Sequence, residues 1–93
     1  MNDTRELAFV KSRTVIQMRE DCSFAISNAC LDEITQRNAF GGIYPPERCE
    51  AIKLYISACR NEYLRCKGLI QAAQTNDESD AVQFVAPPVP EGI

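Results

Sequence analysis

Histidine is absent from the 93-residue chain, which removes the commonest metal ligand and the commonest general base at neutral pH. The five cysteines form no Cys-x-x-Cys knuckle of the kind that brings neighbouring thiolates to zinc or to a redox centre. The carboxylates are scattered over positions that we expect to face solvent. We therefore predict no catalytic residue, no metal site and no cofactor.

Long apolar runs and an excess of positive charge are also missing. No run approaches the roughly 20 apolar residues that span a bilayer, so no transmembrane segment is predicted. The net charge is −3, and all 10 Lys and Arg lie at or before Lys67, which does not favour nucleic-acid binding. The first residues lack a secretory signal pattern, and Asp3, Glu6 and Glu20 argue against a cleavable transit peptide.

Two long helices account for most of the chain. No Gly or Pro precedes Gly41, and Asp3 and Glu6 have the spacing of a capping box, so this first stretch should be one long helix. Paired glycines and prolines between residues 41 and 46 predict a turn. A second helix is expected from Pro46 to about Ala73. Its apolar positions alternate in steps of three and four residues, as in a heptad repeat: Cys49, Ile52, Ile56, Cys59, Tyr63, Cys66 and Ile70.

The predicted fold is therefore all-α, with an antiparallel helix-turn-helix hairpin over residues 1–73 and an extended proline-rich tail over residues 74–93. The tail prolines favour polyproline-II geometry. Val82, Phe84 and Val85 are too apolar for a pure spacer, so we expect them to dock on a partner protein. A disordered terminus is the alternative interpretation.

The cysteines are spaced so that bridges within one helix are impossible. Cys22 and Cys30 would lie about 12 Å apart, and Cys49 and Cys59 about 15 Å apart, whereas a disulfide requires Cα atoms within about 7 Å. Any bridge must therefore join the two helices.

Two helix registers satisfy this condition. One pairs Cys22 with Cys59 and Cys30 with Cys49, and the other pairs Cys22 with Cys66 and Cys30 with Cys59. We prefer the first, because it ties the hairpin beside its turn and leaves Cys66 outside the pattern. A hairpin with five reduced, buried cysteines in the cytosol is the alternative, since free Cys is often buried.

The spacing Cys49-x9-Cys59, with Cys22-x7-Cys30 as a shortened counterpart, resembles the twin Cys-x9-Cys (CHCH) family of the mitochondrial intermembrane space. The resemblance covers roughly residues 15–70. It implies a helical hairpin with two structural disulfides, Cys22–Cys59 and Cys30–Cys49. It also implies a transient partner, an import oxidoreductase that docks on apolar residues near a cysteine, for which Ile52, Tyr55 and Ile56 are the candidates.

A stapled hairpin without catalytic groups is typical of a structural protein rather than an enzyme. The resemblance implies an accessory subunit of a mitochondrial inner-membrane respiratory or ATP-synthesising complex, peripheral to the membrane on its intermembrane-space side. Its partners would be protein subunits of that complex. The alternative is a CHCH-type assembly factor for cytochrome oxidase or a related complex.

Overall fold

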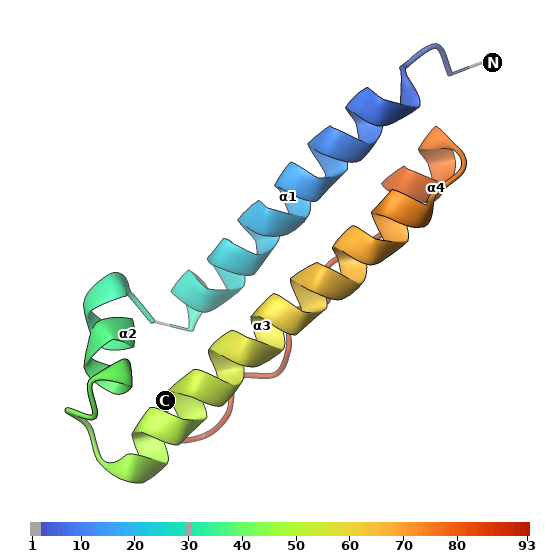
Figure 1. Ribbon diagram of the computed structural model, residues 1–93. Coiled ribbons are helices and arrows are strands. Elements are labelled where there is room, and N and C mark those ends of the chain that lie inside the picture. Colours follow the sequence, from blue (N-terminus) through green and yellow to red (C-terminus); the bar gives the residue numbers. More distant parts are fainter. Residues whose placement is uncertain (1–2, 30) are drawn as a thin grey trace.

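Four helices make up the regular structure of the computed structural model, which describes residues 3–29 and 31–93. They are α1 (Leu7–Asn28), α2 (Glu33–Phe40), α3 (Pro46–Ala72) and α4 (Asn76–Asp80). The described residues contain no strand, so the predicted all-helical class is confirmed. Helices α1 and α3 lie side by side and antiparallel in a rod of 55 × 18 × 17 Å (Figure 1).

The first predicted helix is in fact two helices, so the expectation of one helix up to Gly41 is wrong. Helix α1 ends at Asn28, and Asp32 then starts α2 by accepting a 2.7 Å hydrogen bond from the backbone N–H of Thr35. An Asp side chain that caps a new helix competes with continuation of the old one. At the start of α1, Asp3 pairs with Arg5 and forms no capping box with Glu6.

The turn between α2 and α3 follows the predicted chemistry. Gly42 has a positive φ of 73°, and the N–H groups of Gly42 and Ile43 donate to the carbonyls of Ala39 and Asn38. This is a Schellman motif, which satisfies the last carbonyls of α2. Pro46 then begins α3, where its missing N–H costs nothing, and α3 ends within one residue of the predicted position.

The core follows the predicted heptad positions of α3. Cys49, Ile52, Ile56, Cys59, Cys66 and Ile70 are buried there, together with Tyr55. Met18, Cys22 and Ala25 bury the facing side of α1, and Leu31 and Ala39 extend the core under α2. Helix packing therefore places Cys22, Cys59 and Cys66 in the core between the two long helices, whereas Cys49 is buried near the start of α3, beside Tyr44.

The tail is not entirely extended. Thr75 and Glu78 form a capping box, and this reciprocal pair of hydrogen bonds starts the short helix α4. Helix α4 packs near the start of α1, where the Ser79 hydroxyl lies 3.3 Å from that of Thr14. The residues after α4 are extended and turn back along the hairpin, so the C-terminus lies near the start of α3 (Figure 1). We call residues 82–90 the strap.

Candidate functional site

The candidate site is the contact between α1 and α3, together with the strap that covers one side of it. Several contacts fix the register of the two helices. The Tyr55 hydroxyl donates to the carbonyl of Ala25, and the Lys11 ammonium donates to the carbonyl of Gln71 at the far end. These contacts set Cys22 opposite Cys59, while Cys66 packs in a cluster with Met18.

The cysteines are close but are not bonded. Cys22, Cys49, Cys59 and Cys66 are free thiols, so the Cys22–Cys59 disulfide expected from the sequence is not formed in this structure. The Cys22 thiol points at the backbone carbonyl of Cys59, 3.5 Å away. The Cys49 thiol likewise contacts the carbonyl of Tyr44, at 3.3 Å. Cys30, and with it the predicted Cys30–Cys49 bridge, lies outside the described residues.

Burial keeps the thiols protonated. It raises the pKa of Cys22 and of Cys59, in the first case with a further contribution from Cys59 itself. Burial and the neighbouring Glu62 carboxylate raise the pKa of Cys66. A thiol is a nucleophile only as thiolate, so none of these three groups is prepared for catalysis at neutral pH. Among the described residues, no three side chains of metal-ligand type converge.

The predicted oxidoreductase-docking residues are part of the core. Ile52, Tyr55 and Ile56 are all buried against α1 and α2. These three side chains are therefore inaccessible to another protein in the closed hairpin. Burial and the contact with Cys59 raise the pKa of Tyr55 to about 12.

The strap residues contact this chain's own hairpin. Val82 and Phe84 are half-buried against the core, whereas Val85 is exposed. Two of the three residues predicted to dock on a partner protein, Val82 and Phe84, therefore contact the core of this chain. A cavity of about 390 Å³ remains beneath the strap, with Phe24 and Tyr55 on the hairpin side and Phe84 and Pro87 on the strap side.

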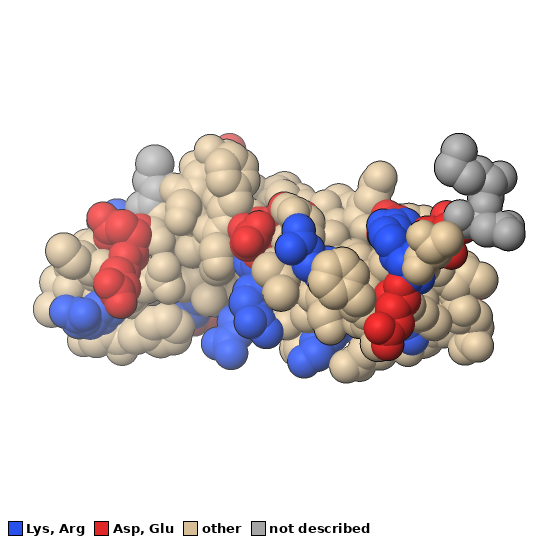
Figure 2. Space-filling view, turned by 90° about the horizontal axis from the view of Figure 1, so that it is seen from above, with Lys and Arg blue, Asp and Glu red and all other residues tan. Residues whose placement is uncertain are grey.

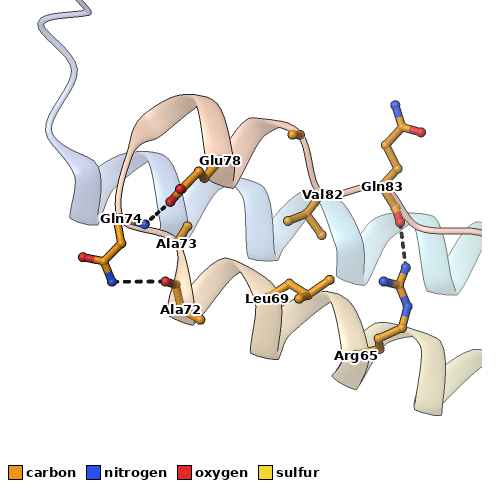
Figure 3. A pocket seen from close by; sticks show the side chains of 9 residues that line it. Arg65, Leu69, Ala72, Ala73, Gln74, Glu78, Val82 and Gln83 are labelled. Carbon is orange, nitrogen blue, oxygen red and sulfur yellow. Dashed lines mark hydrogen bonds between the residues drawn. The ribbon is translucent and has the colours of Figure 1, made fainter.

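An ion pair on α3 holds the strap. Arg65 forms two hydrogen bonds with Glu62, at 2.6 and 2.7 Å, and also donates to the carbonyl of Gln83 at 3.1 Å (Figure 3). Glu62 accepts from the backbone N–H of Val85 at 2.8 Å, and the Cys66 thiol contacts the same Gln83 carbonyl. The Arg65 guanidinium lowers the pKa of Glu62 to about 2. We call Glu62 and Arg65 the clamp.

The clamp was not predicted from the sequence, because an i,i+3 ion pair on a helix is usually solvated surface and the backbone partners of this pair lie about 20 residues away along the chain. Helix α4 could have been found, since Thr75-x-x-Glu78 has the spacing of a capping box.

Comparison with known proteins adds no relative: no family model, curated protein or solved structure matches this chain. No helix among the described residues is both long and apolar enough to cross a membrane.

Proposed function

We propose that this chain is a structural accessory subunit of a mitochondrial inner-membrane complex, docked on its intermembrane-space side as a CHCH-type hairpin. The observation that carries the proposal is the helix register, which brings Cys22 and Cys59 together across α1 and α3. The resemblance in cysteine spacing suggests the compartment. Oxidation there would join these two thiols and staple the hairpin.

The shape of the chain suits a structural role. A rod of 55 Å with large exposed apolar side chains, among them Phe24, Ile34 and Leu54, offers surface for other subunits. Exposed apolar surface on a small chain favours protein contact. A subunit role uses this surface and requires no reactive group.

The proposal is tested in mitochondria of the source cells that carry a tagged copy of the chain. We expect protection from protease in intact mitochondria, digestion after rupture of the outer membrane, and comigration with a large complex on a native gel. Non-reducing peptide mapping should recover a Cys22–Cys59 crosslink. A cytosolic tag with fully reduced cysteines would contradict the proposal, and a tag found only with incompletely assembled complexes would favour the assembly-factor alternative.

A further inference from the structure

The two long sides of the α1/α3 pair differ, because the strap covers one side and leaves the other open. The open side contains a groove of about 350 Å³ between the helices. Val15 and Ile70 line it together with the exposed side chain of Ile16, and Lys11 and Lys67 lie at its edges. The part of the chain that the structure describes places no segment across this groove.

Basic and acidic residues are distributed unequally between these two sides. Helical periodicity places five basic residues on the open side of the long helices, namely Lys11, Arg19, Lys53, Arg60 and Lys67. Within the described parts of α1 and α3, that side carries no Asp or Glu. Asp21 and Glu62 lie instead on the strap side. Figure 2 shows several basic side chains close together along one long edge, near the middle of the molecule.

These cations have no acidic partner among the described residues. The ion pairs found there involve only Arg5 and Arg65. Lys11 binds the carbonyl of Gln71, and Arg19 lies 6.0 Å from the ring centre of Tyr63. Arg19 and Arg60 are exposed, and both are available to an external carboxylate.

We propose that the open groove binds an acidic amphipathic helix of a partner protein, as the third helix of a bundle. This inference rests on the proposed docking function and names the chemistry of its partner. Apolar atoms between basic edges match a helix that carries a narrow apolar stripe flanked by Glu or Asp. A lipid surface would instead require an apolar ridge that projects beyond the charges. A nucleic acid would meet a chain of net charge −3.

The probe is a synthetic amphipathic helix of about 20 residues, long enough to follow α1 over its length. One version carries Glu beside the apolar stripe, and a second carries Lys at the same positions. Titrated into the full chain and followed by amide chemical shifts, the Glu peptide should perturb residues on the open side, including Val15, Arg60 and Lys67. Equal binding of the Lys peptide, or shifts confined to the strap side, would overturn the inference.

Charge reversal gives a second, independent measurement. The double substitution Arg60→Glu and Lys67→Glu should weaken binding of the Glu peptide by about tenfold or more, and raising the salt concentration should do the same in the wild type. The control is Arg13→Glu with Arg37→Glu, which changes the net charge equally at two exposed sites away from the groove. This control should change affinity by no more than about twofold. Equal losses in both variants would overturn the inference.

Three further outcomes test this inference, and the last two separate it from the proposed function. Sedimentation with phosphatidylglycerol vesicles, together with failure to bind the Glu peptide, would identify a lipid surface and overturn the helix proposal. In mitochondria, the wild-type chain and the Arg60→Glu, Lys67→Glu variant could join a complex equally well. This result would overturn the inference about the groove and leave the proposed function intact. A wild-type chain that binds the Glu peptide but joins no complex would overturn the proposed function alone.

Discussion

Ile70 and Leu69 are adjacent in the chain but have opposite environments. Ile70 is fully buried beside Met18 and Cys66, whereas Leu69 is 49% exposed. Removing buried methylenes costs their transfer free energy and leaves a cavity. The contribution of each apolar residue to stability therefore depends on its heptad position rather than on its chemical type.

The substitution Ile70→Ala should lower the free energy of unfolding by about 3 kcal/mol, as measured by urea denaturation followed by circular dichroism. The matched control Leu69→Ala should cost less than about 1 kcal/mol, because part of that side chain already contacts water. Equal losses would mean that α3 does not pack through the predicted heptad face.

A second prediction for a single residue concerns Glu62, which holds the strap. Replacing it with Gln removes the negative charge that pairs with Arg65 and weakens the hydrogen bond from the Val85 N–H, so the strap should open more often. We expect hydrogen exchange at the Val85 amide to accelerate by about tenfold. Glu50→Gln, an exposed change on the same helix, should have no effect there.

The same carboxylate makes strap attachment dependent on pH. Because the folded pKa of Glu62 is lowered from 4.5 to about 2, its contribution is complete above pH 4.5 and is lost as the pH falls towards 2. Exchange at Val85, corrected for its intrinsic pH dependence, should rise over this interval in the wild type and stay flat in Glu62→Gln. A flat wild-type profile would contradict the role of the clamp.

At the scale of elements, capping chemistry decides where helices begin and end. Asp32 splits the first predicted helix, and Thr75 starts α4. The two long helices and the buried face of α3 could be predicted because 3.6-residue periodicity is visible in the sequence. The clamp could not, because its contacts depend on how the tail folds back in three dimensions.

The capping box of α4 should contribute locally. Thr75→Ala removes the acceptor of the Glu78 N–H and should destabilise α4 by about 1 kcal/mol. Hydrogen exchange at the Ser79 amide, which donates to the Thr75 carbonyl, should accelerate about fivefold. The exposed Thr4→Ala serves as control. Unchanged exchange at Ser79 would show that packing on α1, not the capping box, holds α4.

At the scale of the whole molecule, buried thiols connect stability to alkaline pH. The pKa values of Cys22, Cys59 and Cys66 are raised in the folded state above the ordinary value of 9.0. Their stabilising contribution is therefore complete below about pH 9 and is lost as the pH rises through the folded values.

Urea denaturation of the reduced chain between pH 7 and pH 10.5 should show this loss. Replacing the three cysteines with Ala should lower the stability at pH 7 through cavities but flatten its dependence on pH above 9. The slope, not the absolute stability, is the measurement that tests burial of the thiols. An equally steep slope in the variant would assign the effect to other groups.

The strap also limits how the rod can be built into a larger structure. A hairpin with two bare sides could accept a helix on each and serve as an internal layer of a growing stack. Here the chain's own Val82 and Phe84 already contact one side, and only the other remains open. If the open groove binds a partner helix as proposed, such a unit would terminate a helical array instead of extending it, as expected of a component added once at the periphery of an assembly.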